Sequence, residues 1–304
     1  MKAVDLEQFY PSFVADKPVA VIGAGVMGTK VAWACAKANI PTRIFDLDQE
    51  IASAAKQRAL GWGSDEEKVA VTNNLTAVSS LDQALDGVQL AFENVPENLP
   101  LKTRVLADVS SKLHEDAYMG SNASSITCTP LAEASGRPSR FFNLNFSDPL
   151  ASPMVELMCS EYAAPETIQF AKDWAQHIGS VALHVEKEQL GYSFNRLWRV
   201  IKKETLRQLD NNITTPENID RAWMLSFGTD IGPCGIMDEV GLHTVLSIEE
   251  FYYQESGDES DRPPKLLVDM VDKGTLGAAS GQGFYSHPDP AYRKPDFLKG
   301  ESSS

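Results

Sequence analysis

The sequence predicts an α/β fold, in which a doubly wound, mostly parallel sheet is followed by an all-α C-terminal domain. Three observations predict it. Short apolar runs alternate with helical patterns as far as about residue 187, a glycine-rich turn joins the first strand to the first helix, and only helical patterns follow from Glu188 onward. A chain of 304 residues can bury two separate cores. We therefore expect two domains, residues 1–187 and residues 188–304.

The glycine-rich turn is the most informative stretch. Val19–Ile22 is a short apolar strand that ends in Gly23-Ala24-Gly25-Val26-Met27-Gly28, and a helical pattern follows as far as Pro41. In a Rossmann-type fold the first glycine permits a tight turn, the second lets the backbone approach a pyrophosphate, and the third lets helix and strand pack closely. The helix N-terminus supplies free N–H groups for the phosphates. The pattern therefore predicts a dinucleotide site.

The next strand, Thr42–Phe45, ends at Asp46, eighteen residues past Gly28. A carboxylate at this point accepts hydrogen bonds from the ribose hydroxyls and repels a 2′-phosphate, which favours NAD over NADP. We therefore expect NAD as the cofactor. Its first contacts are expected to be Gly23, Gly25, Val26, Met27, Gly28, Asp46 and Leu47.

The remaining elements continue the alternation. We expect strands at residues 75–78, 88–93, 117–119 and 154–159 and at Phe141–Phe146 and Val181–Val185, with helices at Gln49–Leu60, 99–113 and 165–178 and a helical turn at Leu81–Leu85. Residues 66–71 fit either a helix or a strand. In the second domain we expect helices at residues 190–209, 236–253 and 264–273 and a further one that starts at Thr215-Pro216-Glu217. Residues 274–304 are rich in Gly, Pro and Ser, which predicts an extended tail.

Composition narrows the class of protein and its partners. A net charge of −15 argues against nucleic acid or an anionic membrane as a partner. The chain has no apolar run long enough to span a bilayer, and its first twenty residues lack the pattern of a signal peptide. Cys35, Cys128, Cys159 and Cys234 are scattered, without the spacing of metal ligands. We expect reduced thiols, no metal and a cytoplasmic protein.

Four stretches together resemble the 3-hydroxyacyl-CoA dehydrogenase family. They are the glycine-rich turn with Asp46, Glu93-Asn94-Val95-Pro96-Glu97-Asn98 with Lys102, Ser121-Asn122-Ala123-Ser124-Ser125, and 191–196 followed by Gly232-Pro233-Cys234 and Asp238-Glu239-Val240-Gly241-Leu242. The resemblance runs from about residue 18 to 285. It implies an NAD-dependent enzyme that interconverts a 3-hydroxyacyl and a 3-oxoacyl thioester. It also implies a homodimer, because in that family the helical domain pairs two subunits and closes over the substrate.

The resemblance assigns roles to particular residues. It places Glu97, Lys102 and Asn122 at the nicotinamide end of the cofactor, beside Asn94 and Val95. By the same resemblance, Ser124 hydrogen-bonds the substrate oxygen, Glu156 belongs to the catalytic dyad, and Asn195 reaches the substrate from the second domain. Simpler roles compete with these: a structural ion pair for Glu156, an interdomain hydrogen bond for Asn195, and a turn or cap hydroxyl for Ser124.

The chain departs from the family at the position of the catalytic base. Where the family has His-Phe-Phe-Asn-Pro, this sequence has Asn145-Phe146-Ser147-Asp148-Pro149. The Asn145 amide can hold an oxygen by hydrogen bonding but cannot accept a proton near neutral pH. The resemblance is therefore to a divergent member. Three groups could replace the histidine: Glu156, acting directly or through a water, Asp148, or His243.

A second departure concerns the substrate. After the acidic residue the family usually has a long, lysine-rich helical hairpin that helps to hold the CoA. Here residues 49–74 carry only Lys56, Arg58 and Lys68 as basic residues. We expect a 3-hydroxy or 3-oxo acyl compound as substrate, either as the CoA thioester or as the free acid. The alternatives are a dehydrogenase of another small polar alcohol and a non-catalytic NAD-binding protein.

Overall fold

A computed structural model describes residues 13–300 of the chain. The chain divides into two compact units, Met1–Ser193 and Phe194–Ser304. None of the helices in the described part of the chain combines the length and the apolar character needed to cross a membrane.

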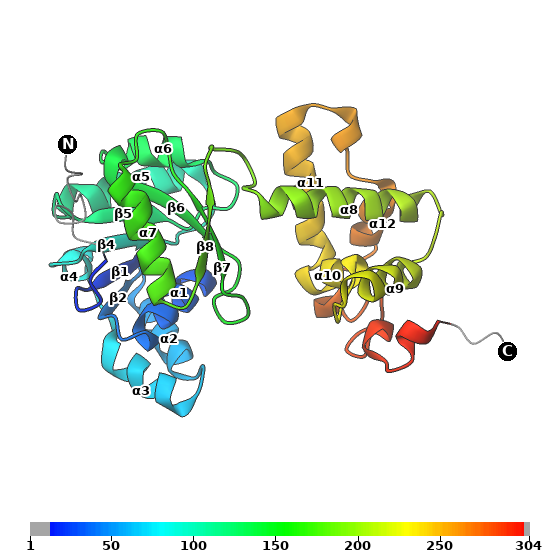
Figure 1. Ribbon diagram of the computed structural model, residues 1–304, viewed down its shortest axis with the longest axis horizontal. Helices are drawn as coiled ribbons and strands as arrows, with labels where there is room; N and C mark the ends of the chain where they lie inside the picture. The colour runs from blue at the N-terminus through cyan, green and yellow to red at the C-terminus, as the bar shows by residue number, and fades with distance from the viewer. Residues whose placement is uncertain (1–12, 301–304) are drawn as a thin grey trace, which may run out of the picture. The chain divides into compact units, whose positions relative to one another are not determined.

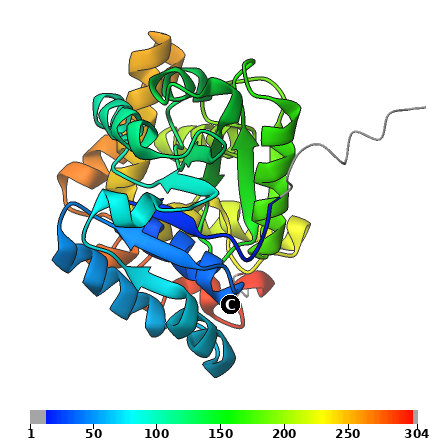
Figure 2. The same ribbon diagram turned by 90° about the vertical axis from the view of Figure 1, so that its left-hand side faces the viewer.

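The first unit is built on an eight-stranded sheet with the strand order β3-β2-β1-β4-β5-β6-β7-β8 (Figures 1 and 2). The strands are β1 Val19–Ile22, β2 Thr42–Phe45, β3 Leu75–Ala77, β4 Leu90–Glu93, β5 Tyr118–Ser121, β6 Phe141–Phe146, β7 Met154–Met158 and β8 Val181–Val185. All neighbouring strands are parallel except β6 and β7. The order of the first six strands is that of a Rossmann fold. The predicted Rossmann-type, mostly parallel sheet is confirmed.

Helices cover both faces of this sheet. They are α1 Val26–Lys37, α2 Gln49–Leu60, α3 Asp65–Asn74, α4 Leu81–Leu85, α5 Leu99–Lys112, α6 Cys128–Ala134 and α7 Pro165–His177, with a 3₁₀ turn at Pro138–Arg140. Side chains alternate between the two faces, as they must in a strand. Val19 and Val21 pack under α1, α2 and α7, whereas Ala20 and Ile22 pack under α4, α5 and α6. The central strand β1 is apolar throughout because both of its faces are buried.

Two helices of this unit were missed or left open by the sequence patterns. No element was expected at α6, a short helix that buries Leu131 and Ala132. The segment that fitted either a helix or a strand is the helix α3. Its start is set by a capping box, in which the Ser64 hydroxyl accepts from Glu67 N and the Glu67 carboxylate accepts from Ser64 N.

The second unit is helical, as predicted. Its elements are α8 Phe194–Asp210, α9 Pro216–Phe227, α10 Pro233–Val240, α11 Leu242–Ser256 and α12 Lys265–Asp272, with 3₁₀ turns at Glu259–Asp261, Ala278–Ser280, Ala291–Arg293 and Phe297–Lys299 (Figure 1). One cluster of its buried side chains includes Leu206, Met237 and Val245, and another includes Met224 and Tyr285.

Two expected helices have different bounds because left-handed residues interrupt them. The helix expected from residue 190 begins only at Phe194, since Gly191 and Tyr192 have φ angles of 78° and 52°. The single helix expected at residues 236–253 is two helices, α10 and α11. Gly241 separates them with a φ of 93°, a conformation that ends a right-handed helix.

The extended tail expected at residues 274–304 is wrong for its described part, which ends at residue 300. Tyr285, Tyr292 and Phe297 are buried in the core of the helical unit. The fully buried Asp238 carboxylate accepts hydrogen bonds from the backbone N–H groups of Phe284 and Tyr285. A composition rich in Gly, Pro and Ser therefore did not produce an extended tail, because buried aromatic side chains and hydrogen bonds to a buried carboxylate fix the segment to the helical unit.

Candidate active site

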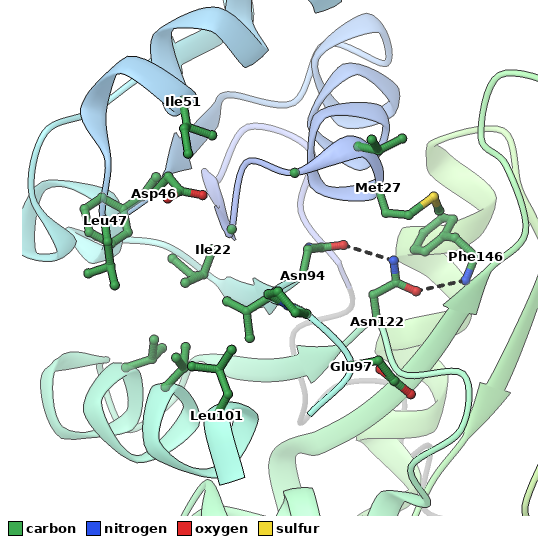
Figure 3. Close-up of a pocket in the computed structure, with 18 of the residues that line it drawn as sticks. Ile22, Met27, Asp46, Leu47, Ile51, Asn94, Glu97, Leu101, Asn122 and Phe146 are labelled. Carbon is green, nitrogen blue, oxygen red and sulfur yellow. Dashed lines mark hydrogen bonds between the residues drawn. The ribbon is translucent and has the colours of Figure 1, made fainter. Parts of the chain in front are cut away.

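A cleft of about 700 Å³ opens in the first unit, at the carboxyl ends of β1, β2, β4 and β5 (Figure 3). It lies at the point where the strand order reverses between β1 and β4, which is where doubly wound sheets bind ligands. Its volume is in the usual range for small-molecule sites. Of the residues expected to contact the cofactor, ten line it: Gly23, Gly25, Val26, Met27, Asp46, Leu47, Asn94, Val95, Glu97 and Asn122.

The glycine-rich turn lines the cleft at the end of β1. Gly23 has a φ of 97°, and a Cβ there would lie 2.9 Å from the Asn94 backbone. A Cβ on Gly28 would lie 1.9 Å from Gly23 O, so the third glycine lets α1 pack on the turn. A Cβ on Gly25 would meet nothing within 4 Å, and no side chain caps the N-terminus of α1. The turn thus presents open backbone and uncapped N–H groups, which fit a pyrophosphate.

Asp46 is held beside this turn. Its Oδ2 accepts a hydrogen bond from Ala24 N at 2.8 Å, and its Oδ1 accepts one from Asp48 N at 3.2 Å. An apolar wall continues from it, formed by the expected Leu47 and by five residues that sequence reasoning missed: Ile51, Leu81, Leu101, Val105 and Val109. A wall of this kind beside a carboxylate can hold a flat base next to its ribose. Its residues come from three helices and a loop, and no local pattern marks them as lining one cleft.

Asn122 joins three strand ends at the other side of the cleft. Its Nδ2 donates to Asn94 Oδ1 at 3.1 Å, and its Oδ1 accepts from Phe146 N at 3.2 Å. Figure 3 shows these two hydrogen bonds, with Met27 beside Phe146. The ends of β4, β5 and β6 are therefore fixed relative to one another at this point.

Glu97 holds the loop that carries Ser124. Its Oε1 accepts hydrogen bonds from Ser124 N at 2.9 Å and from Ser125 N at 2.7 Å. The Ser124 side chain is exposed and lines the cleft, as does Asn145 at the end of β6. Two hydrogen-bonding side chains that were expected to hold the substrate oxygen therefore lie in the same cleft.

Lys102, which the resemblance places at the cofactor, is completely buried and does not line the cleft. Its Nζ lies 2.9 and 3.0 Å from the two carboxylate oxygens of Glu93, a residue that sequence reasoning did not single out. Glu93 ends an apolar strand, and that position of a charged residue is the signal that could have found it. Burial raises the pKa of the Glu93 carboxyl, although Lys102 and Ser121 oppose the shift.

Glu156 is the neighbour of Asn145 across the antiparallel pair of β6 and β7. It is 1% exposed and does not line the cleft. Its Oε1 accepts a hydrogen bond from Ser193 N at 2.9 Å. The strand register therefore brings together the two residues that the resemblance assigns to the family's dyad positions, with Asn145 lining the cleft and Glu156 buried beside it on β7.

The other two candidate bases have different surroundings. Asp148 forms an ion pair with Lys30 at 2.7 Å. Partial burial acts to raise the pKa of the Asp148 carboxyl, but hydrogen bonds from Lys30 Nζ and Leu150 N outweigh it and lower the pKa. A carboxylate of this kind is a weak base. His243 belongs to the helical unit, where it is an exposed residue at the start of α11. Asn195 lies in the same unit on α8.

The cysteines carry no reactive thiol. All four are free and buried. Burial raises the pKa of the Cys35 and Cys159 thiols to about 12, so both stay protonated. Within residues 13–300, no group of three or more His, Cys, Asp or Glu side chains is arranged to hold a metal ion.

The fold and the cleft together define a dinucleotide-binding protein, and comparison with known proteins specifies its family. The model of the 3-hydroxyacyl-CoA dehydrogenase NAD binding domain matches residues 18–189, and the model of the C-terminal domain matches residues 191–287. The chain belongs to the 3-hydroxyacyl-CoA dehydrogenase family. Its cofactor is NAD, and it acts on a hydroxyl group, as members of this family do. The predictions of family, cofactor and enzyme class are confirmed.

Individual relatives cover nearly the whole chain. A probable 3-hydroxybutyryl-CoA dehydrogenase from Deinococcus radiodurans is 30% identical over 276 residues, which cover 88% of this chain and 99% of the relative. The crystal structure of (S)-3-hydroxybutyryl-CoA dehydrogenase from Ralstonia eutropha matches with a TM-score of 0.82 at 26% identity, over 90% of this chain and 100% of the other. A 5-formyl-3-hydroxy-2-methylpyridine 4-carboxylate 5-dehydrogenase from Mesorhizobium japonicum is 26% identical, over 88% and 90% of the two chains.

Proposed function

We propose that this enzyme interconverts a 3-hydroxyacyl and a 3-oxoacyl thioester, with Glu156 in place of the family's histidine as the proton acceptor. The observation that carries the proposal is the pairing of Asn145 with Glu156 at the end of the cleft that Ser124 also lines. Family membership supplies the substrate class, because relatives of full length are named 3-hydroxybutyryl-CoA dehydrogenases.

The cofactor is proposed to lie along the cleft from the glycine-rich turn to Asn122. Gly23, Gly25, Val26, Met27 and Gly28 would receive the pyrophosphate, Asp46 and Leu47 the adenosine half, and Asn94, Val95, Glu97, Lys102 and Asn122 would shape the nicotinamide end. The open backbone at Gly25 and the fixed Asp46 carboxylate support this direction. NAD, when bound, supplies the hydride acceptor.

The chain's own residues have three tasks in the reaction. Ser124 and Asn145 donate hydrogen bonds to the oxygen that changes between hydroxyl and carbonyl. The hydroxyl proton passes to Glu156 through a water, because the carboxylate is buried and does not line the cleft. Asn195 is proposed to position the substrate from the helical domain, as the resemblance implies. Asp148 is not proposed as the base, since its ion pair with Lys30 makes it a weak one.

The oligomeric state and the cellular location are proposed from the exposed apolar side chains and from the cysteines. Leu197 and Val200 on α8 and Leu225 and Phe227 on α9 are exposed apolar side chains, which supports a homodimer formed by the helical domain. The four unpaired cysteines support a cytoplasmic protein. We further propose that the NAD-binding domain comprises residues 1–187 and the helical domain residues 188–304.

The function is tested by NADH consumption with acetoacetyl-CoA, with Glu156→Gln as the decisive variant. Glutamine can still accept the Ser193 N–H but cannot supply a proton to the carbonyl oxygen or take one from the hydroxyl, so kcat should fall by about 10²-fold. Affinity for NADH, measured by fluorescence titration, should stay unchanged because Glu156 does not line the cleft. Wild-type turnover in this variant would show that the proton goes elsewhere.

A free hydroxy acid is the second candidate substrate, and the surroundings of residues 49–74 favour it. Arg58 Nη2 donates to Ala24 O and Thr29 Oγ1, and Lys68 pairs with Asp65 at 3.3 Å. Two of the three basic residues are therefore engaged, and α3 begins with three acidic residues. A CoA 3′-phosphate would meet little positive charge there.

The same assay separates the candidates. Turnover of acetoacetyl-CoA supports the thioester. Turnover of free acetoacetate or another β-oxo acid alone supports the second candidate. No turnover of either, with measurable NADH binding, would refute both and indicate another alcohol or a non-catalytic NAD-binding protein.

A further inference from the structure

We infer that Glu93 and Lys102 act as a buried pair of positioning residues, which holds the Ser124 loop in place through Glu97. Glu93 and Lys102 are 1% and 0% exposed, and neither lines the cleft. A charged pair is costly to bury, and it persists only where hydrogen bonds satisfy it. Its remaining contacts show what the pair organises. This role rests on the proposed function, in which Ser124 contacts the substrate oxygen.

The pair first joins the two loops that border the nicotinamide end. Lys102 Nζ donates to Val95 O at 3.2 Å, in the loop after β4, and to Asn122 O at 3.3 Å, in the loop after β5. The Glu93 carboxylate accepts from Val95 N and from Ser121 Oγ, which lies 2.6 Å from its Oε2. The Lys102 ammonium and the Glu93 carboxylate thus form hydrogen bonds with both the loop after β4 and the end of β5 with its following loop.

The second step leads to the substrate serine. Lys102 Nζ lies 3.6 Å from Glu97 Oε2, and the other oxygen of Glu97 accepts from Ser124 N and Ser125 N. Glu97 is 30% exposed, and Lys102 is the cation that pairs with its Oε2. The charge of Lys102 orients Glu97, and Glu97 fixes the backbone from which the Ser124 hydroxyl enters the cleft. Misplacing a substrate-holding group by about 1 Å can cost about 10²-fold in rate.

The test uses Lys102→Met together with the double variant E93Q/K102M. The double variant keeps the fold accessible, because it leaves no unpaired charge buried. In both variants kcat should fall by about 10-fold to 10²-fold, because the loop that presents Ser124 is no longer held in place. Placed on a Ser124→Ala background, Lys102→Met should lower kcat by less than about twofold, since the group that it positions is already absent.

A second readout does not depend on turnover. The Ser124 and Ser125 amides are held by Glu97, so their hydrogen exchange should become at least about tenfold faster in both variants. Arg137→Met is the matched control. Arg137 donates to Leu113 O and Ala117 O, at the ends of α5 and β5 that lie away from Lys102 and Ser121. Its loss should destabilise the same elements without changing kcat or the exchange of these two amides.

The outcomes are decisive. Wild-type amide exchange in the double variant, an additive effect on the Ser124→Ala background, or an equal loss of kcat in Arg137→Met would each overturn the positioning role. Absence of wild-type turnover with every substrate would refute the proposed function instead, and the amide exchange would still decide the role of Glu93 and Lys102.

Discussion

At the scale of single residues, Asn145 determines what the site can do without a histidine. Asn145 lines the cleft, and Glu156 lies beside it on the next strand. In the proposed mechanism these two side chains divide the tasks of the family's dyad, because an amide can only hold an oxygen and a carboxylate can receive a proton. The reaction should therefore be slow relative to that of histidine-containing relatives, since general acid–base catalysis contributes typically 10²–10⁴-fold.

Asn145→His tests this explanation directly. The imidazole would lie beside Glu156, which can orient it, and could take the hydroxyl proton itself. We expect kcat for 3-hydroxyacyl oxidation to rise by about tenfold or more and to acquire a dependence on pH near the imidazole pKa of about 6.5. Asn145→Ala serves as the control and should lower kcat. An Asn145→His variant no faster than wild type would show that proton transfer does not limit the reaction.

At the scale of elements, Gly241 decides how the helical unit is divided. It ends α10 and begins α11 with a φ of 93°, and a Cβ on it would lie 2.8 Å from the His243 ring. The hydrophobic pattern runs through this position without a break, which is why one long helix was expected. The backbone conformation of Gly241, rather than the pattern of side chains, therefore separates α10 from α11.

Gly241→Ala should therefore destabilise the helical unit by about 1–3 kcal/mol, the cost of holding an L-residue in a left-handed conformation. The measurement is the melting temperature followed by circular dichroism. Gly257 is the matched control, because it ends α11 with a φ of 63° but a Cβ there would meet nothing within 4 Å. Gly257→Ala should cost less. Equal losses in the two variants would show that the contact with His243 adds nothing.

At the scale of the whole molecule, the two compact units have separate cores, and the C-terminal segment contributes side chains to the core of the second unit. The cleft is lined entirely by residues of the first unit. The segment after residue 276 supplies Tyr285, Tyr292 and Phe297 to a core of the second unit. Burial of each such side chain stabilises by on the order of 1.5–3 kcal/mol.

A chain that ends at residue 276 should consequently lose packing in the helical unit and keep its affinity for NADH. Near-ultraviolet circular dichroism reports the loss of packing, and fluorescence titration reports NADH binding. A chain that ends at residue 300 is the control and should match the full-length protein in both. Loss of NADH binding in the shorter chain would contradict the separation of the two units.

Much of the fold and of the cofactor cleft was predictable because the signals are local. The strand, glycine-rich turn and helix at Val19–Ile22 and α1 follow from apolar periodicity and from the close approach at Gly28. Asp46 indicated NAD by its place at the end of a strand. Ten expected cofactor residues line the cleft, since the ends of parallel strands meet at one edge of a sheet.

The sequence by itself determined the fold class, the family, the cofactor and the absence of a histidine at the position of Asn145. Only the tertiary structure decided that Lys102 is buried, that Glu156 lies beside Asn145 on the neighbouring strand, and that the C-terminal segment packs into a core. The physical reason is distance along the chain. Periodicity and turn chemistry act over a few residues, whereas burial of a charge depends on partners such as Ser193, which lies 37 residues from Glu156.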